Sequence, residues 1–233
     1  GTSDPLTFSK TIQYHDTVTS PFGACGVILG GETTVHMARR HGWKPLGKPR
    51  LVKKAKNNII ETIGNAPAFQ LYEDFFKNNL GALKNDAFGK LNARYPLGLF
   101  TKTKEEYLIR NVMDILEDGS IVCQDEVPEG SEIHIMIGNK TSCLQSAMDT
   151  AQEIKNQIKK EKPKFLLIFE SAMRWQVLRH SWKEEFKAVK NILGQDIPIF
   201  GMLTYGEIFN PGTLASAKKV SMLSGNIMML AVI

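Results

Sequence analysis

The sequence predicts an α/β protein with a mixed β-sheet, flanking helices and a βαβ unit near its C-terminal end. Two strongly apolar segments, Phe165–Phe169 and Ile197–Phe200, carry this prediction, because such runs are typical of strands buried on both faces. The amphipathic segment between them begins with a capping-box pattern, Ser181 and Glu184, and is followed by Gly194, a common helix stop. A strand, a helix and a second strand in this order place the two strands parallel in one sheet.

The N-terminal part, to about residue 65, is predicted to consist mainly of strands. Extended or alternating apolar patterns mark three segments: Leu6–Ile12, Ala24–Leu29 and Thr34–Arg40. The stretch Arg40–Gly47, rich in turn residues, predicts a loop. The segments Leu51–Lys56 and Ile59–Ile63 flank Asn57–Asn58, and they predict a β-hairpin because Asn tolerates the positive φ of a tight turn.

Beyond residue 65, helical and extended patterns mix. Pro67 suits the first turn of a helix with an aromatic face, and Asn78–Lys90 predicts a loop or a short helix. Strands are predicted at Tyr95–Leu99, Tyr107–Met113, Gly119–Cys123, Glu132–Ile137 and Asn226–Ile233, the third and fourth as a hairpin-like unit. A long amphipathic helix is predicted from Ser142 to near Lys162 and Pro163. We therefore expect a β-rich segment over residues 1–65 and an α/β domain over residues 66–233.

The composition is that of an ordinary globular protein, with 42% hydrophobic and 23% charged residues. The net charge of +5 comes mostly from scattered lysines, with local concentrations at Arg50–Lys56 and Lys155–Lys164. No aromatic residues are interleaved with these basic residues, so solvated faces are expected rather than a nucleic-acid-binding surface. No segment approaches the roughly 18 apolar residues that a membrane span requires, so none is expected.

The three cysteines, Cys25, Cys123 and Cys143, are odd in number and widely separated. This pattern argues against both a disulfide framework and a zinc site, and it favours a reducing compartment. The five histidines also lack a metal-ligand spacing, so no metal site is predicted. Because the sequence begins without a signal-peptide pattern, we expect a cytoplasmic protein.

Polar residues follow both strands of the βαβ unit, where ligands bind in open α/β sheets. Ser171 and Arg174 follow the first strand, and Thr204, Tyr205, Gly206 and Glu207 follow the second. An Arg fork holds a carboxylate and a Glu receives an ammonium group, so Arg174 with Glu207 suits a zwitterionic amino acid. A salt bridge between the two that fixes both loops is the structural alternative. Ser171 and Tyr205 could add hydrogen bonds, and Gly206 would let a backbone approach closely.

Arg110 lies in an otherwise apolar predicted strand, where its charge must be hydrated or paired. It either supports the same ligand pocket or forms a structural ion pair.

Several motifs resemble, in their order and spacing, the FIST family of intracellular signal-transduction sensor domains. These motifs are His41–Gly47, Tyr95–Gly98, Val127–Gly130, Glu170–Arg174 and Thr204–Ile208. The resemblance implies a sensory input module that binds small molecules such as amino acids and acts on a fused or partner signalling domain. Two features depart from the family pattern: its N-terminal half is usually much longer, and Ser171 stands where many relatives have a cysteine.

Two other functions remain open. One is a serine- or thiol-dependent enzyme using Ser171 or Cys143, although neither comes with a recognisable base and orienting group. The other is a haem-based gas sensor, since some family members are associated with haem, with His180 and His36 as candidate axial ligands. For the leading sensor function no cofactor is expected.

Overall fold

The computed structural model describes residues 12–76, 93–101, 106–209 and 221–233. Within these ranges the chain forms two compact units. Unit 1 comprises residues 1–42, 140–208 and 225–233, and unit 2 comprises residues 43–139 and 209–224. The predicted division at residue 65 stays a prediction. Most of the expected Leu6–Ile12 strand and the whole of Asn78–Lys90 lie outside the described residues.

Unit 1 contains a four-stranded mixed sheet in the order β13-β12-β16-β3. Its strands are β3 (Val35–His41), β12 (Phe165–Ser171), β13 (Ile199–Thr204) and β16 (Asn226–Val232). β12 runs parallel to β13, from the pair Leu166 and Ile199 to the pair Ser171 and Thr204. β16 lies antiparallel to both β12 and β3. The predicted fold class, the mixed sheet and the βαβ unit are thus confirmed.

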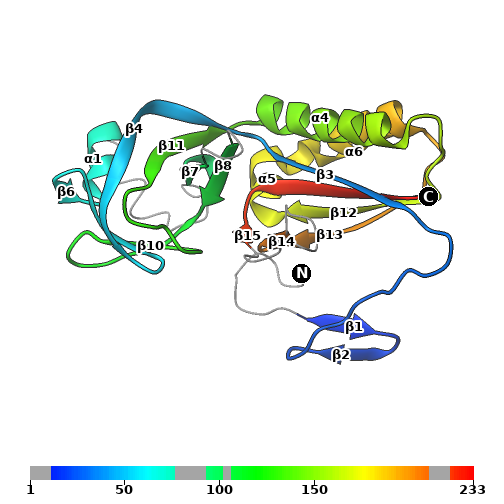
Figure 1. Cartoon of the computed structure of the whole chain (residues 1–233), viewed down its shortest axis with the longest axis horizontal. Coiled ribbons are helices and arrows are strands. Elements are labelled where there is room, and N and C mark those ends of the chain that lie inside the picture. The colour runs from blue at the N-terminus through cyan, green and yellow to red at the C-terminus, as the bar shows by residue number, and fades with distance from the viewer. Residues whose placement is uncertain (1–11, 77–92, 102–105, 210–220) are drawn as a thin grey trace. The chain divides into compact units, whose positions relative to one another are not determined.

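Helices cover one face of this sheet (Figure 1). They are α4 (Lys140–Ile158), α5 (Ala172–Leu178), the 3-10 turn η2 (Arg179–Ser181) and α6 (Trp182–Leu193). Alternate strand residues such as Ile168 and Met229 pack against Ile154 of α4 and Val189 of α6 in one buried cluster. Burial of such apolar side chains stabilises each by about 1.5–3 kcal/mol. This packing holds α4 and α6 against one face of the sheet.

Unit 2 contains a larger sheet in the order β8-β7-β11-β4-β5-β10-β9, with β6 paired to β5. Its strands are β4 (Trp43–Lys56), β5 (Ile59–Ile63), β6 (Ala66–Pro67), β7 (Leu97–Thr101), β8 (Glu106–Arg110), β9 (Val112–Ile115), β10 (Ile121–Cys123) and β11 (Glu132–Gly138). The short helix α1 (Gln70–Phe76) packs Tyr72 into the core that the sheet forms. The predicted turn between β4 and β5 is confirmed, and Asn57 has φ 55° there.

Four short strands complete the described elements. β1 (Gln13–His15) and β2 (Val18–Ser20) pair as an antiparallel hairpin. β14 (Glu207–Phe209) and β15 (Ser221–Leu223) lie where the chain passes from one unit to the other along the sequence. No helix in the described part of the chain is long and apolar enough to cross a membrane.

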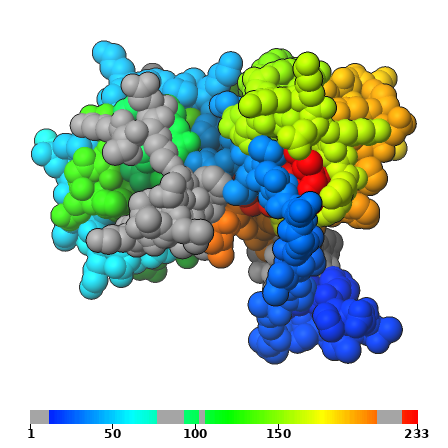
Figure 2. Space-filling view, turned by 45° about the vertical axis from the view of Figure 1, so that its right-hand side comes forward, coloured from blue at the N-terminus to red at the C-terminus, as the bar shows by residue number. Residues whose placement is uncertain are grey.

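The strand predicted at Ala24–Leu29 is absent. This stretch has no regular structure, and Val27 and Ile28 are 83% and 98% exposed; Figure 2 shows this part of the chain in blue. An apolar run forms a strand only where a neighbouring strand accepts its hydrogen bonds. Sequence pattern alone does not supply that neighbour.

The loop predicted at Arg40–Gly47 is also wrong. β3 continues to His41 and β4 begins at Trp43, with only Gly42 between them. A side chain could not occupy this position, because a Cβ on Gly42 would lie 2.7 Å from Cα of Cys143.

Two further predictions at this level are wrong. β10 and β11 form no hairpin, because β10 pairs with β5 and β9 while β11 pairs with β4 and β7. Ser181 makes no side-chain capping bond to α6, since the η2 turn precedes the helix and sets the backbone there. The stop at Gly194 is confirmed: its backbone N–H donates to the carbonyl of Lys190.

Candidate functional site

The polar residues after β12 begin with Ser171, which starts helix α5. Its hydroxyl oxygen accepts hydrogen bonds from the backbone N–H groups of Met173, at 3.4 Å, and Gly225, at 3.1 Å. The side chain is completely buried. Ser171 therefore caps the helix and ties the start of β16 to the end of β12, as N-cap hydroxyls commonly satisfy helix N–H groups.

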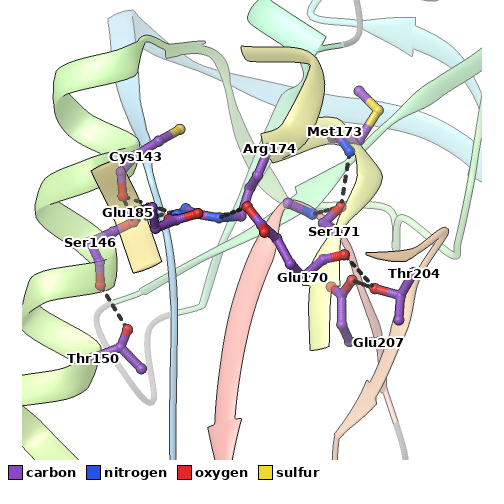
Figure 3. A network of polar contacts seen from close by, with 11 residues as sticks. Cys143, Ser146, Thr150, Glu170, Ser171, Met173, Arg174, Glu185, Thr204 and Glu207 are labelled. Carbon is purple, nitrogen blue, oxygen red and sulfur yellow. Dashed lines mark hydrogen bonds and ion pairs between the residues drawn. The ribbon is translucent and has the colours of Figure 1, made fainter. Parts of the chain in front are cut away.

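Arg174 lies in the first turn of α5, and its side chain points toward Glu185 (Figure 3). This side chain is completely buried. Its Nη1 donates to Oγ of Ser146 at 2.9 Å, and Nη2 donates to the carbonyl oxygen of Cys143 at 3.0 Å. The same Nη2 pairs with the carboxylate of Glu185 from α6. Nε lies 3.6 Å from Oε1 of Glu170 on β12. One cation thus joins β12 and three helices.

Two buried carboxyl groups share this one cation. Burial raises the pKa of Glu170 to about 9, and the neighbouring carboxylate of Glu185 adds to the rise, while Arg174 opposes it. Among the described residues, Oε1 of Glu170 and Oε2 of Glu185 accept no hydrogen bond. A proton on Glu170 leaves the cluster with one negative and one positive charge. Burying this neutral cluster costs less free energy than burying one with a net negative charge.

Glu207 belongs to a second polar group at the end of β13. Its Oε1 accepts a hydrogen bond from Oγ1 of Thr204 at 2.5 Å, and the same hydroxyl lies 3.2 Å from the carbonyl oxygen of Glu170. Burial raises the pKa of Glu207 to about 7, although Thr204 and the backbone N–H of Asn226 oppose the rise. In the described part of the chain no ion pair joins Arg174 to Glu207; each has its own partners.

A hollow of about 530 Å³ lies beside the first cluster and within unit 1. Its walls come from β12, β13, α5 and α6, and they are Ile168, Glu170, Trp175, Trp182, Phe186, Lys190, Ile199, Gly201, Met202 and Leu203. The ionisable members are Glu170 and Lys190, whereas most of the wall is apolar or aromatic. Glu170 both lines the hollow and contacts Arg174. Volume and lining are those of a small-molecule site.

Comparison with known families assigns almost the whole chain. The FIST N domain matches residues 1–66 and the FIST C domain matches residues 68–210. The chain belongs to the FIST family. FIST domains are recognised as sensor domains of signal transduction. No curated protein and no solved structure matches the chain.

The FIST C match includes both polar clusters and the whole lining of the hollow. Within it, the structure brings Ser171, Thr204 and Glu207 to one edge of the sheet and places Arg174 among the helices. Contact of a ligand with Ser171, Arg174, Thr204, Tyr205, Gly206 and Glu207 stays a prediction.

Arg110 lies in unit 2 of the FIST chain, at the end of β8. Its Nε donates to the carbonyl oxygen of Glu126 at 3.0 Å, and Nη2 lies 3.4 Å from the carboxylate of Asp125. Burial lowers the pKa of Arg110, and Asp125 opposes that effect. Arg110 thus forms an ion pair with Asp125, which is one of the two roles that the sequence allowed for it.

The surroundings of Cys143 and Ser171 do not favour either residue as a nucleophile. Cys143 is completely buried, and burial raises the pKa of its thiol to about 11, so the nucleophilic thiolate is scarce near neutral pH. The Ser171 hydroxyl accepts two backbone N–H groups. Among the described residues, no three His, Cys, Asp or Glu side chains gather in a way that could hold a metal. Haem binding through His180 or His36 stays a prediction, which the absorbance of the purified protein would test.

Sequence reasoning missed the hollow and its aromatic wall. Trp182, Phe186 and Lys190 recur at intervals of four along α6, and this spacing places them on one face of a helix. That signal was present in the sequence. The buried role of Glu185 had no such signal, because it lies in the charged run Lys183–Glu185.

Proposed function

We propose that this FIST chain is a sensory input module that binds an amino acid with an apolar or aromatic side chain. The hollow of unit 1 is the proposed site. The observation that carries the proposal is its lining, in which one carboxyl group, Glu170, and one ammonium group, Lys190, stand among aromatic and aliphatic walls.

Each part of an amino acid has a suitable partner in this lining. The ligand ammonium group pairs with Glu170, and the ligand carboxylate pairs with Lys190. The side chain lies against Trp175, Trp182 and Phe186, whose rings contribute apolar contact area and favour a nearby cation. The volume of the hollow, about 530 Å³, falls within the range of about 300–1,000 Å³ that small-molecule sites occupy.

In this proposal Arg174 does not contact the ligand; it transmits the effect of binding from Glu170 to the helices. A ligand that pairs with Glu170 changes the charge next to Arg174, whose other partners lie on α4 and α6. The relative stability of these contacts then differs between the free and bound protein, which is the requirement for a ligand-driven switch. A fused or partner signalling domain in the cytoplasm would receive the change.

Thermal-shift and tryptophan-fluorescence measurements with three related probes test the proposal. L-phenylalanine should raise the melting temperature and change the emission of Trp175 and Trp182. Phenethylamine lacks the carboxylate and 3-phenylpropionate lacks the ammonium group, so each should bind at least about tenfold more weakly, since a bond to a charged group contributes about 1.5–3 kcal/mol.

A pair of lysine variants on α6 locates the site. Lys190→Met should weaken binding of L-phenylalanine but leave phenethylamine unaffected. Lys187→Met is the matched control, because Lys187 is exposed on the same helix and does not line the hollow. Equal binding by all three proteins, or no shift with any of the probes, would contradict the proposal.

A further inference from the structure

The buried cluster beside the hollow contains one more acid than base. Arg174 supplies one positive charge, whereas Glu170 and Glu185 supply two carboxyl groups, and all three side chains are at least 95% buried. With both carboxyl groups ionised, the cluster would hold an uncompensated negative charge away from water, which is very costly. Neutrality requires either a proton or a second cation.

We propose that the second cation is the ligand: an ammonium group enters the hollow beside Glu170 and displaces the proton that neutralises the cluster before binding. This inference rests on the proposed function and adds its chemical form and its pH dependence. The exchange balances, because the carboxylic acid of Glu170 and the ligand ammonium give a carboxylate–ammonium pair and one proton released to solvent.

The contacts around Glu170 support this exchange. Its Oε1 lies 3.6 Å from Nε of Arg174, the cation that also pairs with Glu185, so a second buried carboxyl group is its neighbour. Burial and this neighbour raise the pKa of Glu170 to about 9, so the proton is present at neutral pH. A cation next to a carboxyl group favours its ionised form, so the arriving ammonium group removes the cause of protonation.

The charged and titratable groups facing Glu170 come from three helices. They are Cys143 of α4, Arg174 of α5, and Glu185 of α6, with Lys190 of α6 on the wall of the hollow. The lining residues of β13 are Ile199, Gly201, Met202 and Leu203, none of which titrates. Glu170 is the one carboxyl group in the described lining of the hollow, and its pKa leaves it protonated at neutral pH.

Titration calorimetry with the full chain and L-phenylalanine tests the exchange. At pH 7.5, measurements in phosphate and in Tris, which differ in ionisation enthalpy, should show release of about one proton per bound ligand. The affinity should rise by about tenfold per pH unit between pH 6 and 8, where the amino group of the probe stays protonated. Phenethylamine should behave alike, because its ammonium group alone drives the exchange.

Two further measurements identify the proton. In Glu170→Gln, binding should be weaker, should release no proton and should vary little with pH. Glu184→Gln is the control and should retain the release, because Glu184 is exposed on α6 and does not line the hollow. Should Glu170→Gln not fold, an infrared difference spectrum of the wild type suffices, since the carbonyl band of a protonated carboxyl group should disappear when the probe binds.

The outcomes separate this inference from the proposed function. Binding of L-phenylalanine without proton release overturns the exchange and leaves the amino-acid site standing. Proton release that persists in Glu170→Gln also overturns it, because the proton then comes from another group. Failure of every probe to bind the wild type at any pH overturns the proposed function, and the exchange with it.

Discussion

The carboxyl group of Glu207 lies buried beside the Thr204 hydroxyl, and its Oε2 accepts no hydrogen bond from the described residues. A carboxyl group in such a place is more stable in its neutral, protonated form than in its ionised form. The folded protein therefore holds a proton on Glu207 under conditions in which the unfolded chain has already released it.

This difference predicts a pH dependence of stability. The pKa of Glu207 is about 7 in the folded state, whereas its usual value is 4.5. The contribution of this group to the free energy of unfolding is therefore fully present below pH 4.5, and it is lost as the pH rises to 7. The free energy of unfolding of the wild type should thus fall by up to about 3 kcal/mol from this group between pH 4.5 and 8.

Urea denaturation at pH 5, 6, 7 and 8 measures this fall in the wild type and in Glu207→Gln. The variant should show a shallower decline, because it has no carboxyl group to ionise at this position. Glu153→Gln, on the exposed side of α4, should follow the wild type. Parallel curves for wild type and Glu207→Gln would show that Glu207 titrates normally in the folded state.

For single residues, the sequence predicted which polar side chains lie at the strand ends better than it predicted the partners of each side chain. It placed Ser171, Thr204 and Glu207 at the ends of adjacent parallel strands, because the strands themselves could be recognised from their apolar runs. It could not place Arg174, because the partner Glu185 comes from a helix whose rotation about its own axis depends on the packing of the whole unit. Burial of an Arg is a property of the fold and leaves no mark on the local sequence.

Among the secondary-structure elements, Arg174 acts as a connector. Its guanidinium joins α5 to Ser146 and Cys143 of α4 and to Glu185 of α6. Among the described residues, no other cation forms an ion pair with Glu170 or Glu185. The buried polar contacts that join the three helices therefore centre on one side chain.

Arg174→Ala should lower the free energy of unfolding by about 3–5 kcal/mol, because it leaves Glu185 buried without its cation. Denaturant unfolding monitored by circular dichroism provides the measurement. Arg40→Ala is the matched control: its partner Glu153 also lies on a helix, but both side chains are 40% exposed or more, and the expected loss is below about 1 kcal/mol. Similar losses in the two variants would mean that the buried pair contributes no more than a surface one.

The elements that the sequence predicted well are those with local signals. β12, β16, α4 and α6 each carry an apolar pattern that is complete within the segment. β13 was predicted less well: it runs from Ile199 to Thr204 instead of Ile197 to Phe200, and Phe200 and Met202 are exposed. β4 and β11 were predicted only in part or with the wrong partner, because the choice between neighbouring strands is made by long-range packing. The exposed Ala24–Leu29 shows the same limit, since its pattern is that of a strand but its surroundings are not.

For the whole molecule, the two units are interleaved along the chain. β3 belongs to unit 1 and β4 to unit 2, although one residue separates them. A cut at residue 65 would therefore remove β3 from the sheet of unit 1 and both β4 and β5 from the sheet of unit 2. It would also expose the edge of β16 that β3 covers over seven residue pairs.

A fragment comprising residues 66–233 should consequently fail to unfold cooperatively, as measured by thermal denaturation and by the dispersion of its amide NMR signals. The fragment 33–233 is the control, because it lacks β1 and β2 but retains β3, β4 and β5. It also retains Thr34, whose backbone is hydrogen-bonded to that of Ile233. It should melt within a few degrees of the full chain. A folded 66–233 fragment would instead support the predicted domain boundary at residue 65.

The pairing of β3 with β16 also has a consequence for biosynthesis. Arg39 and Asn226, which are hydrogen-bonded, are 187 positions apart in the chain. At translation rates of about 5–20 residues per second, β3 leaves the ribosome roughly 10–40 seconds before its partner strand. During that interval its edge has nothing to pair with, so the nascent chain of this protein should be a substrate for ribosome-associated chaperones until β16 emerges.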